Sequence, residues 1–210
     1  MSVDLLVRPD IEQLEKILTF ARKLRIECIG IPVEILNQVS TAATKNMRII
    51  PRCIFEIVKG KVKGRTYEST KCLPAYKPVD TPSARRIPIF RKRSIILFNK
   101  SNIRFFDESE ARLLVESDCI AEISLRELLC VSKYSVDSIN ERIRYMRSMY
   151  RILSIISKYD VKAIFSSFAH SWWELWPRNS LISVLTKFGL STDLIKRSIQ
   201  LAKAIALEAM

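Results

Sequence analysis

Histidine and glycine are scarce in this chain of 210 residues, which has one histidine, His170, and four glycines. Barrel enzymes that hold catalytic metal ions use several histidine and aspartate ligands, so a single histidine excludes a multi-histidine metal centre. With so few glycines, the sequence also contains no glycine-rich phosphate-binding loop and no nucleophile-elbow motif. We therefore predict no catalytic residue and no metal ligand in this chain.

Long apolar runs are absent as well. No run approaches the roughly 20 residues that a membrane-spanning helix requires. The first ten residues, MSVDLLVRPD, lack the basic region and the long apolar core of a signal peptide. We expect a cytoplasmic protein that does not associate with membranes.

Paired cysteine motifs are the third absence. The five cysteines lie at least 11 residues apart, so no C-x-x-C motif exists for zinc binding or redox chemistry. Their scattering through apolar, strand-like segments is typical of reduced thiols in a core. This prediction covers Cys28, Cys53, Cys72, Cys119 and Cys130.

Positive charge is abundant. The chain has 35 lysines and arginines against 22 aspartates and glutamates, a net charge of +13 with a pI near 9.7. Such an excess indicates a polyanionic partner, either nucleic acid or an anionic membrane surface. No segment pairs a wide apolar helix face with a fully basic one, so nucleic acid is the favoured partner.

Most of this charge lies between Lys59 and Lys100, where twelve cations stand against two acids and four of the eight prolines occur. The composition predicts a basic, proline-rich loop or insertion at about residues 59–94. Long loops in compact domains are commonly functional, so this one either contacts a polyanion or is a solvated insertion. Arg91, Lys92 and Arg93 lead directly into an apolar strand and are therefore anchored to the scaffold.

Short apolar strands alternate with amphipathic helices along the remainder of the chain. This order is typical of a parallel α/β fold, and seven strands without a domain linker favour a closed or nearly closed barrel. We predict a single domain, residues 1–210, with a TIM-barrel-like (β/α) architecture. The expected strands are Val3–Val7, Glu27–Ile31, Arg48–Val58, Ile95–Phe98, Ile103–Phe106, Cys119–Leu125 and Val161–Phe168.

The longest predicted helix follows the sixth of these strands. Ser138 and Glu141 form an S-x-x-E capping box that indicates its start. Ile139, Ile143, Met146, Tyr150 and Leu153 share one face, which we assign to the core. Four cations lie within roughly 60° of one another on a different face. They form either a solvated surface or a row that meets phosphates, and they are Arg144, Arg147, Arg151 and Lys158.

All three tryptophans, Trp172, Trp173 and Trp176, lie within five residues just beyond the last predicted strand. Indole rings stack on unpaired bases, form hot spots of protein interfaces, or close one end of a barrel. Arg178 follows at the start of a helix, where the N-terminus already favours phosphate.

Several short motifs, in their order and spacing, resemble protein component 3 of archaeal ribonuclease P, a barrel-like subunit shared with the eukaryotic enzyme. The resemblance is good from about Ile103 to Leu190, looser over Val3–Val58, and absent over Lys59–Lys100. The matching motifs are Ile123-Ser124-Leu125-Arg126, Glu141-Arg142, Ser166-Ser167, Pro177-Arg178-Asn179 and Phe188-Gly189.

This resemblance implies a barrel related to metal-dependent hydrolases that has lost its metal ligands. It implies a subunit that binds the catalytic ribonuclease P RNA together with protein component 2 and other protein subunits, and that meets precursor tRNA indirectly. The holoenzyme is an endoribonuclease that removes the 5′ leader of precursor tRNA. Its RNA performs the chemistry with magnesium, so this chain needs no cofactor, and whether the isolated chain is an enzyme is left open.

The resemblance and the charge pattern together give a set of hypothesised contacts. For RNA they are Arg126, Arg147, Arg151, Lys158 and Arg178, with Arg91, Lys92 and Arg93 as second choices. For RNA or a partner protein they are Trp172, Trp173 and Trp176. Two alternatives remain: a metal-dependent barrel phosphoesterase acting on a small phosphorylated substrate, and a protein-interaction scaffold whose basic loop is incidental.

Overall fold

The computed structural model describes residues 2–38, 47–63, 71–129 and 136–209. Seven parallel strands form one sheet in the order β1-β2-β3-β5-β6-β7-β8, and the short β4 pairs antiparallel with β3. The strands are β1 (Val3–Asp4), β2 (Cys28–Pro32), β3 (Arg48–Val58), β4 (Lys61–Lys63), β5 (Leu73–Pro78), β6 (Ile95–Phe98), β7 (Ile120–Ser124) and β8 (Ala163–Ser166).

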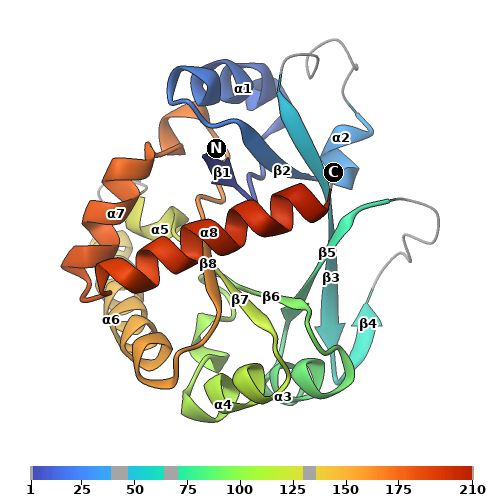
Figure 1. Ribbon diagram of the computed structural model, residues 1–210, viewed down its shortest axis with the longest axis vertical. Coiled ribbons are helices and arrows are strands. Elements are labelled where there is room, and N and C mark those ends of the chain that lie inside the picture. Colours follow the sequence, from blue (N-terminus) through green and yellow to red (C-terminus); the bar gives the residue numbers. More distant parts are fainter. Residues whose placement is uncertain (1, 39–46, 64–70, 130–135, 210) are drawn as a thin grey trace.

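Helices connect most of the successive strands and surround the sheet, while β3, β4 and β5 follow one another with no described helix between them (Figure 1). No helix among the described residues is long and apolar enough to cross a membrane. The α-helices are α1 (Leu14–Lys23), α2 (Val33–Leu36), α3 (Thr81–Phe90), α4 (Glu108–Glu116), α5 (Arg126–Leu129), α6 (Val136–Tyr159), α7 (Arg178–Lys187) and α8 (Thr192–Glu208).

The sheet is a nearly closed barrel. Beyond the ends of β8 and β1 the two chain segments exchange backbone hydrogen bonds. The Phe168 amide donates to the Leu6 carbonyl at 2.9 Å, and the Arg8 amide donates to the Ala169 carbonyl at 3.0 Å. The predicted single-domain α/β barrel is therefore confirmed.

One end of the barrel is covered by α8, which crosses the strands in Figure 1. Ile205 and Ala206 of this helix pack against Cys28, Ile50 and Ile164 from the first halves of their strands. These contacts bury the apolar layer at the end of the barrel where the parallel strands begin. The opposite end, where the parallel strands finish, is the end at which barrel proteins hold their functional loops.

Two of the predicted segments are wrong. Residues Ile103–Phe105 form a 3-10 helix and not a strand. The predicted loop at 59–94 instead contains β4, β5 and α3, and β5 lies between β3 and β6 in the barrel. The prolines of this segment do not exclude regular structure. Pro82 occupies the first turn of α3, where no amide donor is required.

The cysteine prediction is wrong for one pair. Cys53 in β3 and Cys72 just before β5 form a disulfide, because the parallel pairing of these strands brings their Cα atoms to 5.7 Å. Cys28 and Cys119 are buried free thiols, as predicted. Cys130 lies outside the described residues.

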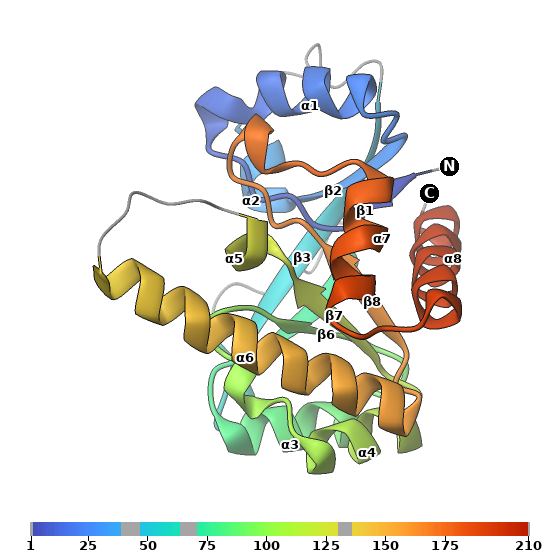
Figure 2. The same ribbon diagram turned by 90° about the vertical axis from the view of Figure 1, so that its left-hand side faces the viewer.

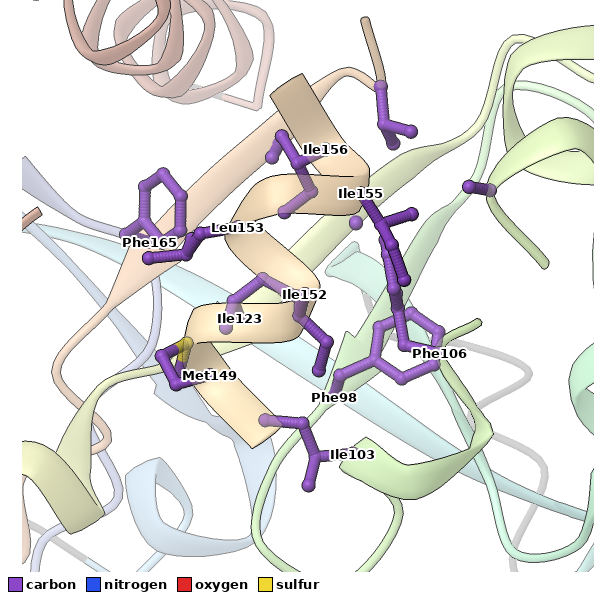
Figure 3. Close-up of a cluster of buried hydrophobic side chains, with 14 of the residues drawn as sticks. Phe98, Ile103, Phe106, Ile123, Met149, Ile152, Leu153, Ile155, Ile156 and Phe165 are labelled. Atoms are coloured by element: carbon purple, nitrogen blue, oxygen red, sulfur yellow. The ribbon is translucent and has the colours of Figure 1, made fainter. Parts of the chain in front are cut away.

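The helix α6 buries a face that shares only Leu153 with the predicted one. Met149, Ile152, Leu153 and Ile156 pack on the outside of the barrel, as Figure 3 shows. The predicted core residues Ile143, Met146 and Tyr150 are instead 42%, 40% and 62% exposed. The side chain of Ile139 lies outside the described part of the chain. Because α6 begins at Val136, the expected cap Ser138 lies inside the helix.

Candidate nucleic-acid interface

The centre of the barrel holds a buried polar layer. Ala121 and Ile123 of β7 pack outward, so the residue between them, Glu122, faces the interior. Glu122 forms a salt bridge with Arg52 of β3, and neither side chain is exposed. The Ser166 hydroxyl donates to the second oxygen of Glu122 at 2.6 Å. Both carboxylate oxygens are thereby used by the protein itself.

The glycine at position 30 makes this layer possible. A Cβ atom there would lie 1.9 Å from the Leu5 carbonyl oxygen and 3.1 Å from Cγ of Arg52. Any larger residue would collide with the backbone at Leu5 and would crowd the arginine. Gly30 therefore permits the close approach of the Leu5 backbone and leaves space for the Arg52 side chain.

A second carboxylate, Asp4 of β1, is buried where the segments after β8 and β1 meet and close the barrel. Its Oδ1 atom accepts the Ser167 amide at 3.1 Å and the Leu6 amide at 3.4 Å. Burial raises the pKa of Asp4 to about 6, although the bonds from Ser167 oppose the increase. Asp4 and Ser167 also line a small cavity that opens between α7 and α8.

His170 and Arg126 meet at the end of the barrel where the strands finish. Arg126 donates to both carboxylate oxygens of Glu174, each at 3.1 Å, and the backbone amide of His170 donates to Glu174 at 2.6 Å. Partial burial and, next, the nearby Arg126 lower the pKa of His170. Arg126 is thus part of an internal network, which the sequence did not indicate.

These groups do not assemble into a metal centre in the part of the chain that the structure describes. No three histidine, cysteine, aspartate or glutamate side chains there lie close enough to hold a metal ion. Asp4, Glu122 and Glu174 each accept hydrogen bonds from neighbouring residues.

The surface of α6 is different. On a wheel of about 100° per residue, Met146, Tyr150 and Ile143 form an exposed band about 60° wide that borders the core face, since Met146 lies about 20° from the buried Leu153. Arg147 and Arg151 lie in the neighbouring band. The helix therefore has three faces: a core face, an exposed apolar band and a cationic band. Its N-terminal part extends past the strands in Figure 2.

The predicted cations of α6 differ in their surroundings. Lys158 donates to Glu108 at 3.0 Å and lies 5.1 Å from the centre of the Tyr159 ring. Arg147 and Arg151 are exposed, and neither forms an ion pair within the described residues. Arg144, the fourth cation of the predicted row, is exposed as well. Of the three hypothesised RNA contacts on α6, Arg147 and Arg151 are the ones available to an external anion.

Arg91, Lys92 and Arg93 lie together between α3 and β6, at the opposite end of the barrel from Arg126. The Arg91 guanidinium is 5.6 Å from the centre of the Tyr76 ring. The Arg93 side chain is 84% exposed, with Asp118 at 3.7 Å. These second-choice contacts therefore form a basic cluster of their own, separate from α6.

The tryptophans divide between two roles. Trp172 packs edge-on against Phe20 of α1 at 5.1 Å between ring centres, and Trp173 packs against Trp172 while 59% exposed. Trp176 lines the cavity beside Asp4, and the exposed Arg178 stands at its edge. Trp173 is thus the one tryptophan of the three with most of its surface open to a partner.

Comparison with known proteins gives a likeness of fold. No protein-family model and no curated protein matches the chain. A chain of the cryo-EM structure of archaeal ribonuclease P with mature tRNA superposes with a TM-score of 0.75 at 13% identity, covering 99% of this chain and 90% of that one. An amidohydrolase crystal structure superposes with a TM-score of 0.59 at 10% identity, covering 100% and 74%. An uncharacterised protein gives 0.57 at 11%, covering 98% and 74%.

Proposed function

We propose that this chain is a protein subunit of ribonuclease P, corresponding to its protein component 3. In this proposal it binds the catalytic RNA and assists removal of the 5′ leader from precursor tRNA in the cytoplasm. The observation that carries it is the likeness of the whole barrel to a chain of archaeal ribonuclease P, in a protein with a charge of +13. The RNA and its magnesium ions supply the chemistry.

The RNA contacts that we propose are exposed cations. Each arginine or lysine that meets a phosphate releases counterions, so binding weakens steeply with salt. Arg147 and Arg151 on α6 are the first candidates, because they have no internal partner among the described residues. Arg178, Arg91, Lys92 and Arg93 follow. Arg126 and Lys158 are weaker candidates, because Glu174 and Glu108 hold them.

We assign the apolar band of α6 to another ribonuclease P protein, such as component 2. Interfaces between proteins favour tyrosine, methionine and arginine. A second copy of this chain does not suit the band, because a two-fold axis through α6 would set Arg147 and Arg151 against their own copies.

The test is reconstitution of the holoenzyme with and without this chain. Ribonuclease P RNA and the other protein subunits would be mixed at low magnesium concentration, and the rate of precursor-tRNA cleavage measured. We expect the rate to rise when the chain is added. An unchanged rate would remove the basis of the proposed function.

The phosphoesterase alternative is tested with the same preparation. The likeness to an amidohydrolase is what favours it, since it rests on the same barrel. Hydrolysis of a small phosphate ester by the RNA-free chain with a divalent metal would support that alternative. We expect no turnover, because internal hydrogen bonds hold Glu122 and Glu174.

A further inference from the structure

Phe90, the last residue of α3, is the most exposed of the large apolar side chains in the described part of the protein, at 75%. Its exposure follows from the register of the helix. Ser83, Ala84, Ile87 and Pro88 turn toward the barrel and are buried. The next two residues therefore point away from it, and the neighbour Ile89 is 53% exposed.

The backbone around Phe90 is fixed to the body of the protein. The Arg91 amide donates to the Ile87 carbonyl at 2.8 Å, which ends the helix. The Arg93 amide donates to the Ser117 carbonyl at 3.0 Å, and the Cys119 thiol lies 3.4 Å from the Arg91 carbonyl. The Phe90 ring thus projects from a backbone segment that hydrogen bonds fix in place. Little backbone entropy is therefore lost when a partner binds the ring.

Basic residues flank Phe90 in the sequence. Residues 81–93 contain five arginines and lysines and no acid. Arg85 is occupied by Asp107 and Glu110, but Arg86, one helical turn before Phe90, is exposed. Lys92 is exposed too, and Arg93 has a single acidic neighbour at 3.7 Å. An aromatic ring in such a setting suits a ligand that carries both flat rings and negative charges.

A single-stranded nucleic acid has this chemistry. Its bases stack on aromatic side chains without regard to sequence, and its phosphates pair with the flanking cations. A duplex keeps its bases stacked on one another and offers only phosphates to the same surface. A membrane surface calls for a broader apolar face than Ile89 and Phe90 provide.

We propose that Phe90 is a stacking platform for an unpaired base of the RNA that this chain binds, with Arg86, Lys92 and Arg93 on the adjoining phosphates. The identity of that RNA rests on the proposed function, but the stacking does not. Phe90 was not among the residues singled out from the sequence. The signal that marks it is the run I-P-I-F-R-K-R, in which an aromatic residue directly precedes three cations.

The experiment measures binding of purified chain to a single-stranded oligouridylate RNA and to an RNA duplex of equal length. Phe90→Leu keeps the apolar volume and removes the aromatic ring, so we expect single-strand affinity to fall about 5- to 150-fold, the range for one stacked base. Affinity for the duplex should not change. Phe90→Trp should restore single-strand binding. Leu207→Ala, at another exposed apolar position, is the matched control and should bind as the wild type.

Ultraviolet cross-linking adds a direct readout, because a stacked uracil reacts with the ring beneath it. Mass spectrometry should locate the cross-linked base on Phe90. Equal losses for single strand and duplex, wild-type affinity in Phe90→Leu, or a Phe90-dependent attachment to anionic phosphatidylserine vesicles would each overturn the proposal.

Precursor-tRNA cleavage separates this inference from the proposed function. If the chain fails to stimulate reconstituted ribonuclease P while Phe90→Leu still loses single-strand binding, the proposed function fails and the stacking platform stands. If the chain stimulates cleavage and Phe90→Leu binds single strands normally, the reverse holds.

Discussion

Arg52 and Arg147 carry the same guanidinium group in opposite surroundings. Arg52 lies inside the barrel, is fully buried and is paired with Glu122. Arg147 stands on the outer face of α6 without an ion-pair partner among the described residues, next to an exposed apolar band. In the barrel interior, where an enzyme of this fold holds its reactive groups, Arg52 and Glu122 are paired with each other. The Nε and Nη1 atoms of Arg52 are buried there without a hydrogen-bond partner among the described residues. The helix surface leaves its charges and its apolar side chains available to partners.

The largest difference between the two regions should appear when the interior pair is broken. Arg52→Met leaves the Glu122 carboxylate buried with only Ser166 as a partner, so we expect a loss of about 3–5 kcal/mol in the free energy of unfolding. Denaturant titration measures it. The double variant Arg52→Met, Glu122→Leu should recover much of the loss, because no charge is then left unpaired. A single variant as stable as the wild type would show that the pair is not buried as described.

Asp4 makes the stability of the folded protein depend on pH. Its folded pKa is about 6, and in the unfolded chain the carboxyl titrates near its ordinary value of about 4. The folded protein therefore holds the proton more tightly, and stability from this group is lost as pH rises from about 4 to about 6. The shift of about two units corresponds to about 3 kcal/mol as an upper figure.

Asp4→Asn removes this titration while its amide oxygen can still accept from Ser167 and Leu6. We expect the stability of the variant relative to the wild type to increase by up to about 3 kcal/mol between pH 4 and pH 7. Glu110, whose pKa burial raises to about 7, is present in both proteins and cancels. If the difference in the free energy of unfolding between Asp4→Asn and the wild type stayed constant from pH 4 to pH 7, Asp4 would have to be in contact with solvent.

The cations of α6 should behave in the opposite way. Arg147→Ala with Arg151→Ala should leave the free energy of unfolding within about 0.5 kcal/mol of the wild type for each change. Binding to ribonuclease P RNA should weaken, and the slope of log affinity against log salt should fall by about 0.7–0.9 for each phosphate that the protein no longer neutralises. Lys162→Ala is the control, because Asp118 already holds that lysine and it is not among the proposed RNA contacts. An unchanged salt slope in the double variant would remove α6 from the RNA interface.

Local signals in the sequence were sufficient where one segment determines its own structure. The strands Arg48–Val58 and Ile95–Phe98 have the predicted bounds. Local capping is seen at α8 as well, where the Ser191 hydroxyl accepts the Leu194 amide at 3.2 Å. The count of seven barrel strands was also right, although β5 replaced the segment at Ile103–Phe106.

The features that the sequence did not predict are contacts between segments that lie far apart in the chain. Glu122 meets Arg52 across 70 residues and Arg126 meets Glu174 across 48, so no spacing in the sequence indicates either pair. Cys53 and Cys72 are joined only because β5 enters the sheet beside β3. On α6, two apolar bands with helical spacing lie side by side, and periodicity alone cannot tell which one faces the barrel.

Two consecutive residues of α6 provide the finest form of the comparison, and the exposed one carries the smallest expected effect on stability. Met149 is fully buried, whereas Tyr150 is 62% exposed. Met149→Ala should cost about 2–5 kcal/mol because it opens a cavity against the barrel. Tyr150→Ser should change the free energy of unfolding by no more than about 0.5 kcal/mol. Its effect should appear instead as weaker association with the protein subunits of reconstituted ribonuclease P. Equal destabilisation by both changes would mean that the helix lies in a different rotation, and the apolar band would then belong to the core.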